Sequence, residues 1–89
     1  MSPKAAELER RLAELHAELA RTQSVDRESR ELLEHVRRDI ESVLERSDES
    51  GRSSLRERLE TAIEHFETSH PVLTATMGRV MDQLANLGI

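Results

Sequence analysis

The chain has 89 residues, a formal net charge of −5 and no cysteine, and Phe66 is its single aromatic residue. This length allows one domain, residues 1–89, whose core must be built mainly from aliphatic and methionine side chains. The lack of cysteine excludes disulfides and thiolate metal sites. An acidic chain without a cluster of Lys and Arg is also a poor ligand for nucleic acids or anionic lipids.

Targeting and membrane signals are missing from this sequence. No apolar h-region follows the N-terminus, and no uncharged run approaches the ~20 residues of a membrane span. We therefore expect a cytoplasmic protein with neither nucleic-acid nor membrane partners.

The first periodic segment predicts a helix over about 4–21. Pro3 suits a first helical turn, and Glu7 stands four residues before Arg11, a favourable ion-pair spacing. The apolar stripe is narrow, as in a coiled-coil seam. It consists of residues spaced by three and four: Ala5, Leu8, Leu12, Leu15 and Leu19.

A second helix is predicted over about 26–46, after a connector in which Ser24 or Asp26 is a plausible N-cap. Its apolar stripe comprises Leu32, Leu33, Val36, Ile40, Val43 and Leu44. Charged residues at the i,i+4 spacing decorate the other side and predict four ion pairs. These are Arg27–Glu31, Arg30–Glu34, Glu34–Arg38 and Arg37–Glu41.

Residues 47–53 are polar and contain Gly51, so they predict a loop. Ser54 and Glu57 then match a capping box, which predicts a third helix over about 54–68. Its stripe is formed by Leu55, Leu59, Ala62, Ile63 and Phe66.

The fourth helix is predicted over about 71–86, because Pro71 disfavours helical backbone at His70 and favours the first helical position. Ser69, His70 and Pro71 are therefore interpreted as connector and cap, and Gly88 as a left-handed C-terminal stop. One alternative remains open. Apolar residues continue at intervals of seven through the proline, so the third and fourth helices could form one kinked rod rather than a hairpin.

The fourth helix carries few charges, which predicts burial on several sides. It would be the central helix of a monomer, or the interface between copies of the chain. The interface candidates are Leu73, Met77, Val80, Met81, Leu84 and Leu87.

The sequence contains no strong catalytic, metal-binding or phosphate-binding motif. His16, His35, His65 and His70 do not match the spacing of zincins, and three isolated glycines form no phosphate loop. Glu67 and His70 have the Glu-x-x-His spacing of di-iron bundles, but this segment runs into the predicted helix break. The neighbours Ser69 and His70 are not expected to form the hydrogen bond that a catalytic couple needs. We expect no catalytic, metal or cofactor site. A pH-dependent role of His70, with Glu67 as acceptor, stays open.

Several short segments resemble a family of small bacterial proteins catalogued as domain of unknown function 4404. They are Leu15 with Glu18-Leu19, the Arg-Glu-Leu-Leu run at 30–33, Phe66-Glu67-x-x-His70-Pro71-x-Leu73 and Leu84-x-Asn86-x-Gly88-Ile89. The resemblance spans nearly the whole chain. It implies a small α-helical protein and brings no catalytic residues.

The sequence thus predicts an all-α protein of four helices, paired as two αα-hairpins and self-associating. The expected function is that of a non-enzymatic interaction or scaffold protein that acts through its amphipathic helix faces. The alternative is a regulatory or stress-related accessory subunit that docks a larger protein through the apolar fourth helix.

Overall fold

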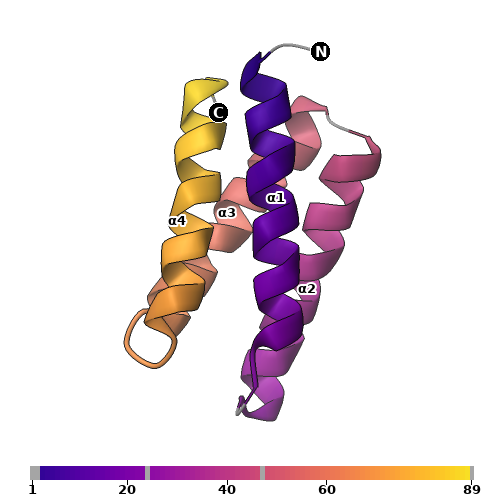
Figure 1. The fold of residues 1–89 in the computed structure, drawn as a ribbon. Helices are drawn as coiled ribbons and strands as arrows, with labels where there is room; N and C mark the ends of the chain where they lie inside the picture. Colours follow the sequence, from indigo (N-terminus) through magenta and orange to yellow (C-terminus); the bar gives the residue numbers. More distant parts are fainter. Residues whose placement is uncertain (1–2, 24, 47, 89) are drawn as a thin grey trace.

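The computed structural model describes residues 3–23, 25–46 and 48–88, and these form four α-helices (Figure 1). The helices are α1 (Pro3–Arg21), α2 (Arg27–Glu45), α3 (Glu49–Phe66) and α4 (Pro71–Asn86). No β-strand occurs in the described part of the chain. The predicted all-α, four-helix class is confirmed.

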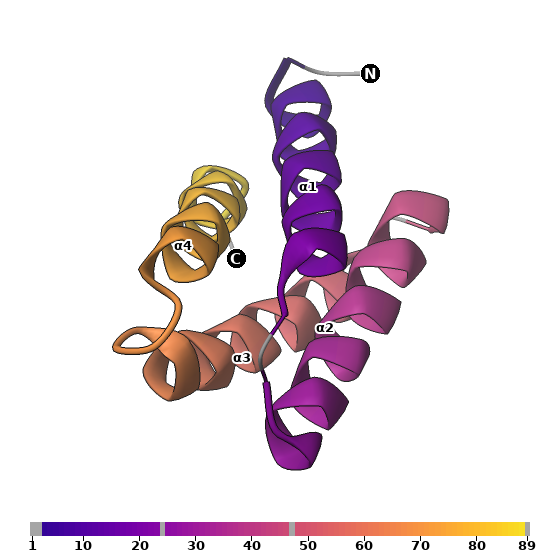
Figure 2. The same ribbon diagram turned by 60° about the horizontal axis from the view of Figure 1, so that its bottom comes forward.

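The helices alternate in direction and pack in chain order around one core (Figures 1 and 2). α1 packs against α2 and α4, and α3 packs against the same two helices. Short connectors explain this order, because each permits only an antiparallel neighbour. The N-terminal end of α1 and the C-terminal end of α4 lie at one end of the bundle (Figure 1). There, Lys4 Nζ donates to the Asn86 carbonyl oxygen over 3.3 Å.

Every helix turns its apolar stripe toward the axis of the bundle. The buried hydrophobic residues are Leu8, Leu12, Leu15, Leu33, Val36, Ile40, Val43, Leu55, Leu59, Ala62, Phe66, Leu73, Met77, Val80 and Leu84. Removing these side chains from water is the main stabilising contribution of the fold. The apolar stripes predicted from the 3.6-residue period contain most of this core. Leu44 is a wrong prediction, because its side chain is 40% exposed. Ala5, Leu19, Leu32 and Ile63 lie at the edges of the stripes and are only partly buried.

The ends of α1 and α2 lie within one residue of their predicted positions. Asp26 is the N-cap of α2, and its carboxylate accepts from the Ser29 backbone N–H at 2.8 Å. Hydrogen bonds from Ser29, above all from its backbone N–H, hold the pKa of Asp26 below the usual range. The other predicted cap, Ser24, lies outside the described residues.

The predicted start of α3 at Ser54 is wrong, because α3 begins at Glu49 and Ser54 lies inside it. Asp48 is the N-cap, and its carboxylate accepts from the Gly51 N–H at 2.7 Å. A Cβ on Gly51 would lie only 3.1 Å from the Asp48 carboxylate, so glycine permits this close cap. The cap and the packing of α3 along α2 outweigh the loop-like composition of 49–53, since propensity is a weak determinant.

We expect the Asp48→Ala substitution to lower the free energy of unfolding by about 1 kcal/mol, because the Gly51 N–H loses its acceptor. Ser54→Ala is the matched control and should change it by less than about 0.5 kcal/mol, since alanine is a good residue for the exposed interior of a helix. Urea unfolding followed by circular dichroism measures both. The opposite order of effects would mean that α3 starts at Ser54.

The third and fourth helices form a hairpin and not a kinked rod. α3 ends at Phe66, α4 begins with Pro71 at its first turn, and the two helices pack against each other. His70 occupies the N-cap position of α4, although its side chain makes no capping hydrogen bond. At the other end, Gly88 has φ of 85°, which confirms the predicted left-handed stop.

Candidate functional site

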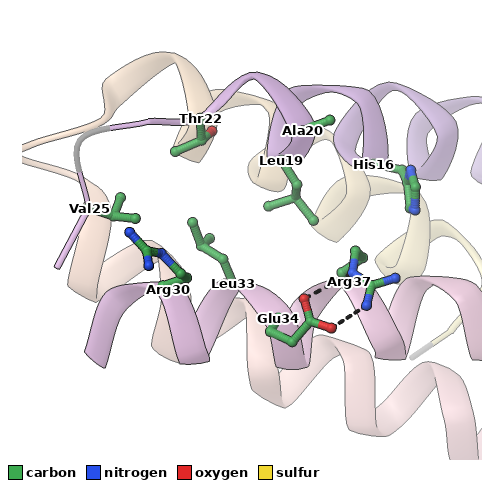
Figure 3. A pocket seen from close by; sticks show the side chains of 9 residues that line it. All are labelled: His16, Leu19, Ala20, Thr22, Val25, Arg30, Leu33, Glu34 and Arg37. Carbon is green, nitrogen blue, oxygen red and sulfur yellow. Dashed lines mark hydrogen bonds and ion pairs between the residues drawn. The ribbon is translucent and has the colours of Figure 1, made fainter. Parts of the chain in front are cut away.

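A partly apolar groove lies between the C-terminal half of α1 and the N-terminal half of α2, here named the α1–α2 groove (Figure 3). It has a volume of about 260 Å³ and is open to solvent. Its lining residues are His16, Leu19, Ala20, Thr22, Val25, Arg30, Leu33, Glu34 and Arg37. Leu33 is buried, whereas Leu19 and Val25 are partly buried and pack against the core. The floor of the groove is therefore a partly buried edge of the core.

A chain of charged contacts forms one rim of this groove. Arg37 pairs with Glu34 on one side (Figure 3). On the other side it pairs with Glu41, at 2.7 Å. His16 Nε2 lies 3.0 Å from the same Glu41 carboxylate and thereby ties α1 to α2. Hydrogen bonds from His16 and then Arg37 lower the pKa of Glu41.

Arg30 also lines the groove but does not belong to this chain of paired charges. The predicted Arg30–Glu34 pair is wrong, because Glu34 is taken by Arg37 and by Arg38, the latter at 3.5 Å. Arg30 is exposed, and its guanidinium has no ion-pair partner in the described chain. It therefore stands at the groove as an uncompensated positive charge. The other predicted pairs of α2 are present, with Arg27–Glu31 at 3.6 Å.

An open groove with an apolar floor and a charged rim suits one or two inserted side chains of another protein better than an enclosed small ligand. Pockets for drug-sized ligands are usually about 300–1,000 Å³ and cover most of the ligand. Sequence reasoning missed this site. Val25, an apolar residue isolated in a polar connector, was the available signal.

The four histidines do not gather at one site, although His65 and His70 both contact the ring of Phe66. His35 is exposed on the charged side of α2, as expected. His65 Nε2 lies 2.7 Å from Ser29 Oγ and so joins α3 to α2, a contact that sequence reasoning missed. Ser29 is one of two buried polar residues in the described chain. In that same part of the chain, no group of three or more His, Asp or Glu side chains is arranged to hold a metal ion.

The expectation that Ser69 and His70 form no hydrogen bond is wrong, because His70 Nδ1 lies within hydrogen-bond distance of Ser69 Oγ, at 2.8 Å. Its Nε2 lies 3.4 Å from the Gln23 carbonyl oxygen, on the connector between α1 and α2. Its ring also meets the edge of Phe66, with centroids 5.5 Å apart. The ring nitrogens thus face Ser69 and Gln23 rather than Glu67. The arrangement holds the two connectors together at one end of the bundle.

The interface candidates on α4 face the interior of their own chain. Leu73, Met77, Val80 and Leu84 are buried, with exposures of 0–3%. Met81 and Leu87 are partly buried and pack against the same core. In this fold, the four buried side chains offer no surface to another protein unless α4 leaves the bundle.

Comparison with known proteins gives one match. The sequence profile described as "Domain of unknown function (DUF4404)" matches residues 8–89. Neither the curated proteins nor the solved structures contain a match. In the described part of the chain, no helix is both long enough and apolar enough to cross a membrane.

Proposed function

This chain belongs to the DUF4404 family of domains of unknown function, and we therefore propose a function from the surface of the chain itself. The protein is a non-enzymatic α-helical interaction protein that associates with further copies of itself and serves as a scaffold. The observation that carries this proposal is the α1–α2 groove, where part of the apolar core reaches the surface beside charged side chains.

Two properties of the groove support the proposal. First, its floor consists of Leu19, Val25 and Leu33, so an apolar side chain inserted there would displace water from hydrophobic surface. Second, its rim charges are mostly paired within α2, whereas Arg30 is free to pair with an incoming acid. A partly apolar centre with a polar rim is the usual anatomy of a protein interface.

The proposal also places the protein in the cytoplasm, without nucleic-acid or membrane partners. The net charge of −5 supports the lack of nucleic-acid and anionic-lipid partners, because phosphate-rich partners are held by clustered positive charges. The partner that binds in the groove is a protein.

The test is the solution mass by sedimentation equilibrium over a wide range of protein concentrations. We expect the wild-type mass to rise above the 10.2 kDa of one chain as the concentration increases. Ala20→Glu places a carboxylate at the groove and should keep the protein monomeric. Ala75→Glu, at an exposed site on α4, is the matched control and should leave the association unchanged.

Two results would count against the proposal. A wild-type mass of one chain at every concentration would refute self-association. Association that survives Ala20→Glu would show that the groove is not the surface used.

A further inference from the structure

One side of α2 carries a line of exposed and half-buried residues that leads from the α1–α2 groove to the other end of the helix, here named the α2 ridge. Its members follow the spacing of one helix side. They are Arg30, Glu34, Arg37, Glu41, Leu44 and Glu45. Leu44 is 40% exposed and is, with Val72, one of two exposed large hydrophobic residues in the described chain. The ridge therefore has a groove at one end and an apolar side chain at the other.

The two ends of the ridge also carry opposite charges that the chain itself leaves unpaired. Neither Arg30 nor Glu45 has an ion-pair partner among the described residues, whereas Glu34, Arg37 and Glu41 between them are all paired. Each of the two charges stands at the end of the helix where the helix dipole disfavours its sign. Arg30 closes the first turn of α2 and Glu45 is its last residue, although the macrodipole favours acids at the N-terminus and bases at the C-terminus. A partner outside the chain would compensate both.

We propose that two copies of this chain pair through the α2 ridge, with their α2 helices antiparallel about a twofold axis. Leu44 of each copy enters the α1–α2 groove of the other, and Arg30 of each copy pairs with Glu45 of the other. This inference rests on the proposed self-association and names the surface, the register and the partner, which is a second copy of the chain.

The register follows from helix geometry. When Arg30 stands opposite Glu45 of the second copy, the twofold axis passes between Arg37 and Arg38. Leu44 of the second copy then stands opposite position 31, two residues or about 3 Å along the axis from Leu33 on the groove floor. One register therefore satisfies both the charged contact and the apolar contact. The contact is isologous, so each occurs twice.

The remaining surface is compatible with close approach. In this register Glu34 of one copy stands opposite Glu41 of the other and Arg37 stands opposite Arg38, so like charges face each other around the axis. Each of these side chains is already paired within its own α2, as Glu34–Arg37, Arg37–Glu41 and Glu34–Arg38, and the layer as a whole has no net charge. Along the adjoining side of α1, the exposed residues Ala13 and Ala20 are small and seven apart, and they leave room for a second helix.

Charge exchange between copies tests the proposal by sedimentation equilibrium. Arg30→Glu alone and Glu45→Arg alone should each weaken self-association by roughly tenfold or more, because like charges then meet twice in the dimer. An equimolar mixture of the two variants should associate as wild type does, since the mixed dimer restores both opposite-charge contacts. Each substitution places the charge that the helix dipole favours, so loss of folding does not explain a weakened dimer. Circular dichroism checks this.

Glu64→Arg reverses another exposed charge, on α3, and is the matched control that should leave association unchanged. If the wild type associates but mixing the variants does not restore affinity, the α2 ridge is the wrong surface while self-association stands. If the wild type is monomeric at all concentrations, both the proposed function and this inference fail.

Discussion

Replacing Val80 by aspartate is expected to unfold the protein. Val80 is fully buried in α4, and a carboxylate at this position would lie in the apolar core without a partner. The cost should exceed about 4 kcal/mol, a large part of the 5–15 kcal/mol that stabilises a typical domain. Circular dichroism and urea unfolding of the purified variant measure the loss of helix.

Val72→Asp is the control on the same helix. Val72 is 68% exposed and lies in the first turn of α4, where the helix dipole favours an acid. This variant should retain wild-type stability within about 0.5 kcal/mol. A Val80→Asp variant that stays folded as a monomer, while the wild type associates, would instead place α4 at the interface between copies.

Phe66→Ala is expected to have the second-largest effect, a loss of about 3–5 kcal/mol in the free energy of unfolding. Phe66 is 1% exposed, and its ring meets the His65 ring edge-on with centroids 4.7 Å apart. Alanine would leave a cavity where α3 ends, below the connector that carries His70. The urea midpoint should fall accordingly, and the α3–α4 end of the bundle should lose protection in hydrogen exchange.

Phe66→Leu provides the comparison for this prediction. Leucine retains most of the apolar volume and should cost clearly less than alanine, because the cavity is smaller. Equal effects of the two substitutions would show that the aromatic ring contacts matter more than the volume of the side chain.

Most of the fold could be predicted from local patterns because each helix carries its own amphipathic period. Pro71 and Gly88 mark the ends of α4 through backbone constraints that act within one or two residues. The start of α3 could not be predicted in the same way. Asp48 and Ser54 are both competent caps, and the structure selects Asp48, whose helix gains a further turn along α2.

The contacts of the candidate site could be predicted from the sequence less well than the helices, because they depend more on the tertiary structure. Spacing alone predicted that Glu34 pairs with Arg30 and with Arg38, yet the carboxylate lies with Arg37 and Arg38. Several partners at spacings of three and four compete for each charge on a helix surface, and their energies differ by only a few tenths of a kcal/mol. The contacts of His16 with Glu41 and of His65 with Ser29 join different helices. No spacing within one helix contains that information.

The sequence by itself determined the all-α class, the apolar stripes, three of the four helix starts to within one residue and the family to which the chain belongs. These features arise from periodicity and from the local chemistry of caps, proline and glycine. Only the tertiary structure decided that α4 lies against its own chain, that Pro71 begins the second arm of a hairpin, and that Arg30 stands unpaired beside an apolar groove. The reason is physical: an apolar stripe requires burial, but it does not specify which surface covers it.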